Sequence, residues 1–364
     1  MTEMNYCIVD VEANGALRNK AHPFDPRNKA LLVGTRRRLM QSVFDVGYNG
    51  NPSRGTLFDL ESTLSRKTLY VGFNIKYDLH WLHNLGCKTQ LGEIKVWDCQ
   101  LAEFILEGQR NPYNSLEDAC LKYNLPLKKD ILKEYLAKGM DVDEIPLPEL
   151  TEYLEGDLVS TEELFLKQID LIAPYWELFN LQCQDLLVLA DMEYNGMKYD
   201  LEKSASLAAG CTAQEAPIIT DLNNLVKVEN PYVQINWNSG DQLSAVLYGG
   251  TIGYDYREFI GVFKTGPRAG QAKTAIRTYY HTFERLVEPL RGSEVQKPGF
   301  WKTDEGTLKE LRAKGIAKEV IKWVLKLEEL SKLRSTYYEG IPNRFVEFGW
   351  QDNLVHGNLS QCVA

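Results

Sequence analysis

The first part of the chain alternates short apolar runs with segments of helical periodicity. Tyr6–Glu12 is a β-branched run that ends in two acids and is followed by Ala13-Asn14-Gly15, which predicts a strand that enters a turn. Further strands are predicted over Ala30–Gly34, Ser42–Val46, Leu69–Phe73 and Ile94–Trp97, and helices over Asn74–Leu85, over Cys99–Leu106 and from Ser115 onward. Because strands come first and helices then dominate, the pattern predicts an α/β domain with a mixed sheet over residues 1–171.

Residues 172–364 show a different pattern, which predicts a second, mainly helical domain. Apolar residues recur at helical spacing at Tyr175, Phe179, Cys183, Leu186 and Ala190, and again at Val320, Val324, Leu327, Leu330 and Leu333. We expect these two long helices to pair as an antiparallel arm. Between them, residues 258–280 predict a β-hairpin with its turn at Thr265–Gly270. The hairpin carries four basic residues, Lys264, Arg268, Lys273 and Arg277.

Composition disfavours several classes of protein. The seven cysteines lie far apart, form no C-x-x-C pair and are odd in number, so a zinc ribbon or a disulfide scaffold is disfavoured and a reducing, cytoplasmic setting is favoured. No apolar run approaches the ~20 residues of a membrane helix. Met1–Asn5 lacks the basic and apolar regions of a secretory signal. Five histidines leave little room for a histidine-rich metal site.

The charge of the chain is unevenly distributed. A net charge of -9 argues against a simple basic coat for nucleic acid. Residues 141–200 hold 15 Asp and Glu against only two basic residues, Lys167 and Lys198. Most of these acids are expected to form solvated helix faces, whereas a few are expected to turn inward and hold cations.

Two pairs of polar residues in the first domain have spacings that place them on one face of an element. Asp10-x-Glu12 puts two carboxylates on the same face at the end of a strand, because strand side chains alternate with a period of two. Asn74-x-x-x-Asp78 puts an amide and a carboxylate on one helical face. Each pair taken alone is more often structural than catalytic.

A third pair, Tyr153-x-x-x-Asp157, points a phenol and a carboxylate the same way from one helix. In this order, Asp10 and Glu12, then Asp78, then Tyr153 and Asp157 resemble the three-motif signature of the DEDD 3′→5′ exonucleases, in the subtype with Tyr in the third motif. The resemblance implies a ribonuclease H-like 3′-5′ exonuclease domain with a mixed sheet.

The second half resembles the thumb of the family A DNA polymerases. The segments that carry this resemblance are Met192–Gly196 followed by Asp200, Gln234–Leu243, Leu330–Tyr337 and, for the first palm strand, Val355–Gln361. The resemblance therefore covers nearly the whole chain. The basic hairpin is longer than the corresponding link in bacterial polymerase I and is more similar to the phage-encoded branch, which implies the host cytoplasm as the compartment.

The polymerase motifs of palm and fingers are missing from this sequence. In the family, Gln361 would be followed by T-G-R-L-S-S and later by the carboxylate motifs that bind the polymerase metals, whereas this chain ends at Ala364. We therefore expect no nucleotide polymerisation by this chain alone. Either the sequence is truncated or a second polypeptide carries palm and fingers.

The resemblance also implies a mechanism that uses two Mg²⁺ or Mn²⁺ ions. Asp10 would bridge the two metals, Glu12 and Asp157 would complete the nucleophile-side site, and Asp78 would hold the second metal largely through water. Tyr153 would orient the attacking water. Mg²⁺ prefers oxygen ligands, which suits a chain with clustered acids and few histidines.

Residues expected to contact the substrate follow from the same resemblance. Asn74 would lie behind the metal ligands or touch substrate, and Lys332, Arg334, Thr336 and Tyr337 resemble the thumb element that contacts the DNA backbone. The basic residues of the hairpin either follow phosphates or serve solubility. The aromatic residues Tyr77, Trp81 and Phe104 are candidates for stacking on single-stranded DNA, although each is more often a core residue.

Three further polar residues are expected to be structural. Asp98 precedes a predicted helix at Cys99 and is expected to cap it. His80 and His83 lie three apart on a predicted helix with no visible third ligand, so we expect them to pack or to face solvent.

Three functions remain open on the sequence. The first is a metal-dependent 3′-5′ proofreading exonuclease acting on single-stranded or frayed DNA ends, joined to a thumb. The second is a ribonuclease D-like nuclease that trims RNA 3′ ends with the same four acids. The third is a non-catalytic subunit that clamps primer DNA for a polymerase partner. The intact set of acids argues against the third, and the thumb-like half argues against the second.

Overall fold

The computed structural model describes residues 5–38, 40–64, 68–87, 94–111, 114–127, 131–228, 230 and 232–362. The chain forms two compact units. The first comprises Met1–Asp200 together with Asn343–Ala364, and the second comprises Leu201–Pro342. A domain division at residue 171 stays a prediction.

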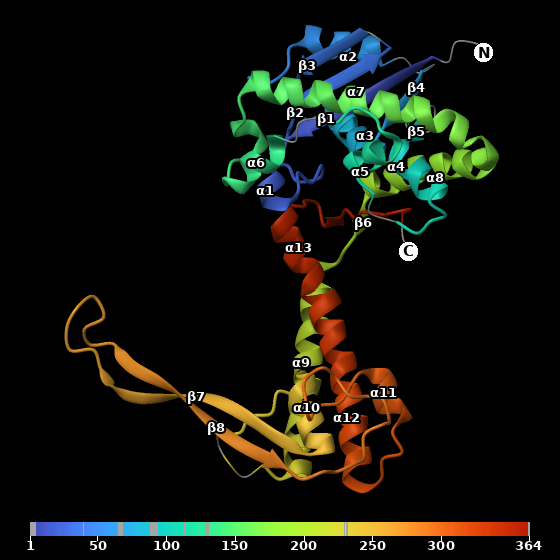
Figure 1. The fold of residues 1–364 in the computed structure, drawn as a ribbon. Helices are drawn as coiled ribbons and strands as arrows, with labels where there is room; N and C mark the ends of the chain where they lie inside the picture. The colour runs from blue at the N-terminus through green and yellow to red at the C-terminus, as the bar shows by residue number, and fades with distance from the viewer. Residues whose placement is uncertain are drawn as a thin grey trace. The chain divides into compact units, whose positions relative to one another are not determined.

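A five-stranded mixed sheet forms the centre of the first unit (Figure 1). Its strands, in the order β3-β2-β1-β4-β5, are β3 (Met40–Asp45), β2 (Ala30–Arg37), β1 (Tyr6–Ala13), β4 (Leu69–Gly72) and β5 (Lys95–Asp98). Strand β1 is antiparallel to β2 and parallel to β4, and β4 is parallel to β5. The predicted α/β class with a mixed sheet is confirmed.

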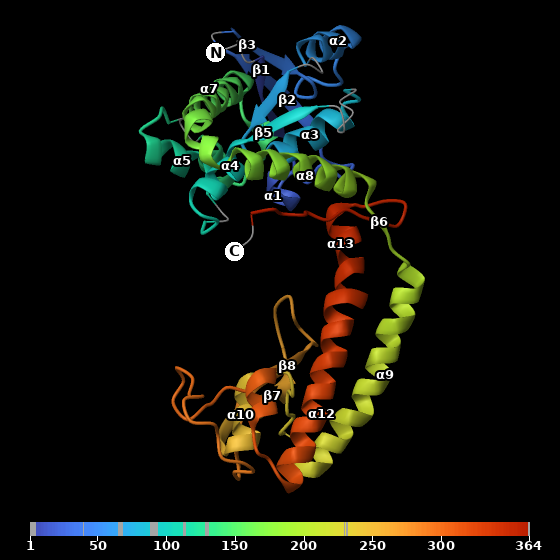
Figure 2. The same cartoon turned by 90° about the vertical axis from the view of Figure 1, so that its right-hand side faces the viewer.

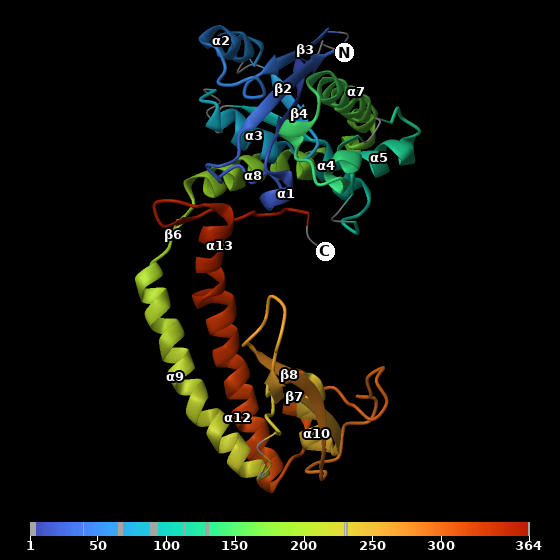
Figure 3. The same ribbon diagram turned by 90° about the vertical axis from the view of Figure 1, so that its left-hand side faces the viewer.

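Helices cover both faces of this sheet (Figures 2 and 3). The helices of the first unit are α1 (Ala16–Asn19), α2 (Arg54–Thr63), α3 (Ile75–Asn84), α4 (Cys99–Leu106), α5 (Leu116–Tyr123), α6 (Ile131–Ala137), α7 (Leu147–Leu171) and α8 (Trp176–Asn195), with short 3-10 turns at Val142–Glu144 and Ala173–Tyr175. Helix α7 packs on β1 and β2, whereas α3 packs on β1 and on α8. This places α7 and α3 on opposite sides of β1.

Helix α7 lies close to the sheet because β2 offers it a glycine. A Cβ on Gly34 would lie 2.8 Å from Leu158 Cδ1, so the leucine fills the space that a larger strand residue would take. Leu158 is fully buried, and so are Leu154 and Phe165 of the same helix. The burial of this apolar stripe fixes the helix over the sheet.

Helix α8 belongs to the core of the first unit. Its buried side chains Phe179, Cys183, Leu186 and Ala190 join the same apolar cluster as the strands. They are the positions that the helical periodicity selected, except that Tyr175 is half exposed. The first unit also includes the end of α13 (Gly340–Phe348) and the two-residue strand β9 (Leu354–Val355), which pairs with β6 (Met197–Lys198).

The second unit is built on two long antiparallel helices, α9 (Leu201–Val226) and α12 (Gly315–Lys332), which pack side by side (Figures 2 and 3). The predicted pairing of the helix near Phe179 with the helix near Val324 was wrong. The first of these helices buries its apolar face on the sheet, and α12 pairs with α9 instead. Helix α9 is rich in small residues and contains Pro217, so its apolar stripe is weak in the sequence.

The predicted hairpin forms and is longer than expected. Strand β7 (Gly250–Val262) pairs antiparallel with β8 (Ala272–Phe283). The second unit is completed by α10 (Gly240–Tyr248), α11 (Glu305–Glu310) and a π-helical turn at Leu333–Tyr338. In Figure 1 the far end of the hairpin projects away from the helices of its own unit.

We expect Leu158→Ala to destabilise the first unit by about 2–5 kcal/mol, because the vacated space is enclosed between helix and sheet. Leu166→Ala is the matched control on the same helix, since that side chain is 45% exposed, and its cost should stay within about 0.5 kcal/mol. Hydrogen exchange of the β1 amides under increasing urea measures both. Equal costs for the two variants would contradict the packing described here.

Candidate metal centre

Three carboxylates from two elements meet at the centre of the first unit. Asp10 and Glu12 project from β1 on one side of the strand, and Asp157 comes from α7. Carboxylate oxygens of the three residues lie within 4.8 Å of one another, and Glu12 and Asp157 are buried. The structure thus brings together three of the four predicted metal ligands. Oxygen donors at this spacing are the ligand set that Mg²⁺ or Mn²⁺ prefers.

The fourth acid, Asp78, approaches the same strand from α3. Its Oδ1 accepts a hydrogen bond of 2.9 Å from the backbone N–H of Val11, the residue between the two strand acids. Burial raises the pKa of Asp78 well above its usual value, and the charge of Asp10 raises it further. A divalent cation beside these groups would reverse that tendency and favour the charged carboxylates.

The loop after β1 is fixed by hydrogen bonds to the turn before α7. Asn14 Nδ2 donates to Asp143 Oδ2 at 2.9 Å, and Gly15 N donates to Asp141 Oδ2 at 3.0 Å. Gly15 has a positive φ of 89°, and a Cβ there would collide with the side chain of Asn28. The strand end that bears Glu12 is therefore held by both glycine geometry and paired polar groups.

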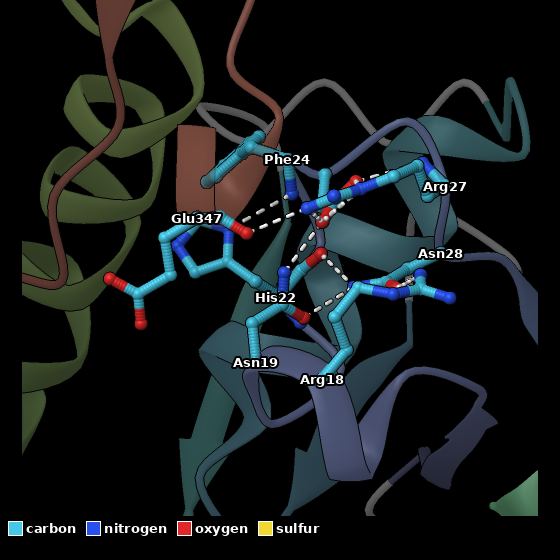
Figure 4. Close-up of polar contacts among 8 residues, drawn as sticks. Arg18, Asn19, His22, Phe24, Arg27, Asn28 and Glu347 are labelled. Carbon is cyan, nitrogen blue, oxygen red and sulfur yellow. Dashed lines mark hydrogen bonds and ion pairs between the residues drawn. The ribbon is translucent and has the colours of Figure 1, made fainter. Parts of the chain in front are cut away.

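A second polar network shapes the continuation of this loop (Figure 4). Arg27 binds the buried Asp25 with two nitrogens, at 2.8 Å from Nε to Oδ1 and 2.5 Å from Nη2 to Oδ2. Asn19 Nδ2 donates to Asp25 Oδ2 at 2.6 Å, and Asn28 Nδ2 donates to Asn19 Oδ1 at 2.8 Å. Arg27 Nη2 also donates to the backbone oxygen of Glu347 at 2.6 Å, which ties the loop to α13 within the first unit.

The predicted partners of the acids lie on the expected elements. Tyr153 is buried on α7, one turn before Asp157. Asn74 is exposed, has a left-handed backbone and precedes α3, and its backbone N–H donates to Asp98 Oδ1 at 3.1 Å. Asp98 also accepts from the backbone of α4 and caps that helix, as predicted. The roles of Tyr153 and Asn74 stay predictions.

Two of the aromatic candidates for base stacking are core residues. Trp81 and Phe104 are each 2% exposed and belong to the apolar cluster of the first unit, so neither offers a ring face to a base. Tyr77 is partly buried, and its hydroxyl donates to the backbone oxygen of Ala21 at 3.1 Å. The stacking hypothesis for Trp81 and Phe104 was wrong because both rings fill the interior.

The four residues of the thumb element lie in the second unit, around the end of α12 and the π-helical turn. Lys332, Thr336 and Tyr337 are exposed. Arg334 is engaged within the unit, with Nε at 3.2 Å from Glu215 Oε1 and Nη1 at 3.1 Å from Glu339 Oε2. A phosphate contact by Arg334 would compete with these carboxylates, and the predicted DNA contacts of all four residues stay predictions.

The sequence analysis missed a buried ionic network around Glu193 of α8. Lys76 Nζ lies 2.6 Å from Glu193 Oε1, and His80 Nε2 lies 2.8 Å from Oε2. Lys76 Nζ also donates to the backbone oxygen of Leu359 at 2.6 Å, and the Leu359 N–H donates to Glu193. Burial opposes the charge of Glu193, but the hydrogen bonds from His80, Lys76 and Leu359 outweigh it and lower its pKa.

This network helps to fix the helix that carries Asp78, because Lys76 and His80 lie two residues before and after Asp78 on α3. The i,i+4 spacing of Lys76 and His80 places them on one face of the helix, and this pair is the signal that could have revealed the network. His80 packs as expected, and its ring is hydrogen-bonded to the Glu193 carboxylate. His83 stacks on Tyr194, with ring centroids 3.6 Å apart.

Comparison with known proteins gives a structural relative and no sequence relative. No family model matches the chain, and no curated protein matches its sequence. The fold is similar to that of the polymerase domain of Pol1 from M. smegmatis, solved in complex with DNA primer-template and dNTP, with a TM-score of 0.65 and 14% sequence identity. The match covers 100% of this chain and 50% of that chain.

The chain has a DNA polymerase-related fold. At 14% identity the likeness concerns the fold alone, and this chain spans about half of its structural relative. Among the described residues, no helix is both long enough and apolar enough to cross a bilayer. The carboxylate triad is therefore the feature on which a functional argument rests.

We expect Asp157→Asn to raise the melting temperature in EDTA, because it removes one of three mutually repelling carboxylates. Mg²⁺ or Mn²⁺ should stabilise the wild-type chain, by about 2.7 kcal/mol at a concentration 100 times the dissociation constant, and should stabilise the variant much less. Asp59→Asn, at an exposed acid on α2, controls for the change in net charge. Equal metal responses in all three proteins would count against a metal site here.

The pH dependence of stability should carry a contribution from His22. Burial and then His356 lower the pKa of His22 to about 4, with Asp25 and Glu193 acting in the opposite direction. Between pH 6.5 and pH 4 the unfolded chain therefore binds a proton that the folded chain does not, so stability should fall as the pH falls through this window. His22→Asn should flatten this slope relative to wild type, as measured by urea unfolding at a series of pH values. An unchanged slope would contradict the assignment.

Proposed function

We propose that the chain is a metal-dependent 3′-5′ exonuclease that acts on single-stranded or frayed DNA 3′ ends. The observation that carries this proposal is the meeting of Asp10, Glu12 and Asp157 within 4.8 Å. Carboxylates that a strand and a helix bring this close repel one another, and a cation among them would offset that repulsion, which supports a metal site here. Asp78, hydrogen-bonded to the same strand, supplies a fourth acid.

We also propose that the first unit is ribonuclease H-like. The sheet order β3-β2-β1-β4-β5, with β2 antiparallel to its neighbour β1, supports this assignment. The acids lie on the central strand β1 and on the helices α3 and α7 that pack against it. This is the arrangement that the resemblance to the DEDD exonucleases implies for Asp10, Glu12, Asp78 and Asp157.

The donor set fits Mg²⁺ or Mn²⁺, since it consists of carboxylate oxygens with no nitrogen or sulfur. Asp10, Glu12 and Asp157 would hold the ions, and Asp78 would assist, largely through water. When bound, two divalent ions supply a hydroxide at neutral pH and offset the charge of the leaving oxygen. The carboxylates would hold the ions whose charge lets the anionic phosphate approach, and Tyr153, one turn from Asp157, would orient the attacking water.

DNA is the proposed substrate rather than RNA. The structural relative was solved with DNA primer-template, and this chain shares its fold over its whole length. The second unit would then serve as a thumb, with Lys332, Arg334, Thr336 and Tyr337 toward the DNA backbone. A second polypeptide carrying palm and fingers belongs to the same proposal. Trimming of RNA and a purely clamping role are the alternatives that the following experiment separates.

The test is degradation of a 5′-labelled single-stranded DNA, and of RNA of the same sequence, in Mg²⁺ and in EDTA. Wild type should produce a ladder that shortens from the 3′ end of the DNA in Mg²⁺. EDTA and Asp10→Asn should each reduce the rate by at least about a hundredfold, because the site then lacks its cations or one of its ligands. Tyr153→Phe should reduce the rate by about 10–100-fold, since it perturbs only the water.

Asp59→Asn again serves as the matched control and should cleave at the wild-type rate. Preferential cleavage of RNA would favour the trimming nuclease. A folded wild-type chain that cleaves neither substrate with Mg²⁺ or Mn²⁺ would contradict the proposed nuclease activity. It would leave the clamping subunit as the better account.

A further inference from the structure

The end of the β7–β8 hairpin carries positive charge alone. From Phe259 to Phe283 the chain has four basic residues, Lys264, Arg268, Lys273 and Arg277, and no Asp or Glu in 25 residues. The chain as a whole has a net charge of -9, so this concentration of cations runs against its overall balance. Such a local field attracts a polyanion even when the net charge of the protein repels it.

The base of the hairpin is anchored, whereas its far part is exposed on both faces. Ile252, Tyr254 and Phe283 are buried in the core of the second unit. Tyr256 stacks on Tyr232, with ring centroids 4.4 Å apart. Beyond this point, residues of both strands are exposed or half exposed, so the ribbon is held at one end only.

One exposed face of the ribbon presents three large apolar side chains. The strand register pairs Gly253 with Tyr280, Arg257 with Ile276, and Phe259 with Thr274, which puts all six residues on the same face. Tyr280 is 69% exposed, Ile276 is 67% exposed and Phe259 is 63% exposed. Three large apolar side chains that are each more than 60% exposed on one face of a strand pair indicate a surface that a partner covers.

Tyr280 lies across from a glycine and is 69% exposed. Gly253 lies directly across from it, and a Cβ at that position would be 3.2 Å from Tyr280 Cε1. The ring thus lies against the bare glycine backbone on one side. Most of the Tyr280 surface stays accessible, so the ring can be reached by a planar group that stacks on it.

The cations of the hairpin lie next to this face and at the turn. Arg257 is exposed and directly opposite Ile276. At the turn, Arg268 and Lys273 both approach the ring of Phe263, at 5.9 Å and 6.0 Å from its centroid. Arg277 is paired with Glu258 at 2.9 Å, so the charges at the turn are the ones available to a ligand.

We infer that the far part of the β7–β8 hairpin binds single-stranded nucleic acid, as a site separate from the carboxylate centre. Lys264, Arg268 and Lys273 contact phosphates, and the open rings of Phe259 and Tyr280 stack on bases. A single strand offers both negative charge and planar faces. An acidic protein surface would satisfy the cations but would leave the aromatic rings without a planar partner.

The experiment measures the affinity of the full chain for a fluorescent oligothymidylate by anisotropy in EDTA, so that it does not depend on nuclease activity. The triple variant Lys264→Gln/Arg268→Gln/Lys273→Gln should bind about a hundredfold more weakly at about 0.1 M salt. Its slope of log K against log salt should be shallower by about 2, from three lost phosphate contacts. The matched control is Lys138→Gln/Lys167→Gln/Lys318→Gln, which removes the same charge from exposed positions and should bind as wild type.

The aromatic contacts are tested separately. Phe259→Ser/Tyr280→Ser should weaken binding by about fivefold or more with an unchanged salt slope, whereas Tyr280→Phe, which keeps the ring, should bind as wild type. Identical affinities of the two triple variants would overturn the inference and point to an acidic protein as the occupant of the hairpin. Equal binding of the oligothymidylate by wild type and by Phe259→Ser/Tyr280→Ser, or tighter binding of duplex DNA than of the single strand by wild type, would overturn the assignment to single strands.

Discussion

The architecture of the first unit depends on holding like charges together. Asp10, Glu12 and Asp157 place carboxylate oxygens within 4.8 Å of one another, and Asp78 adds a further acid at the same strand. Repulsion at this range is strong where protein screens it less than water does. The packing of α7 on β2 and the hydrogen bond from Val11 to Asp78 keep these groups close, and a bound cation would turn their repulsion into attraction.

Several independent contacts hold the elements around the metal centre in place. The loop after β1 is tied to the turn before α7 through Asp141, and α3 is held on its other side by Glu193 through Lys76 and His80. Removing one partner from a buried network of this kind costs several kcal/mol, so these contacts maintain geometry that the acids alone would lose. The hairpin of the second unit, in contrast, has few contacts that fix it. It is anchored at its base and free along most of its length, which suits a surface that adapts to a flexible ligand.

Much of this organisation was predictable, and the exceptions have physical causes. The strands followed from short β-branched runs, and the carboxylates followed from spacings that fix a common face, as for Asp10 and Glu12. The pairing of α9 with α12 did not follow, because α9 is built of small residues and contains Pro217. The Glu193 network joins residues more than 100 positions apart, and local periodicity carries no information about such a contact. The sequence allowed Trp81 either to stack on a base or to pack in the core. The structure buries the side chain, which shows that it packs in the core.

The most direct measurement is anomalous diffraction from crystals of the full chain grown with Mn²⁺. The account predicts a peak among the carboxylates of Asp10, Glu12 and Asp157, with a second ion toward Asp78, and the loss of both peaks in crystals of Asp10→Asn. A well-ordered site without anomalous density, or manganese bound only elsewhere on the chain, would contradict the claim that these acids form a metal centre.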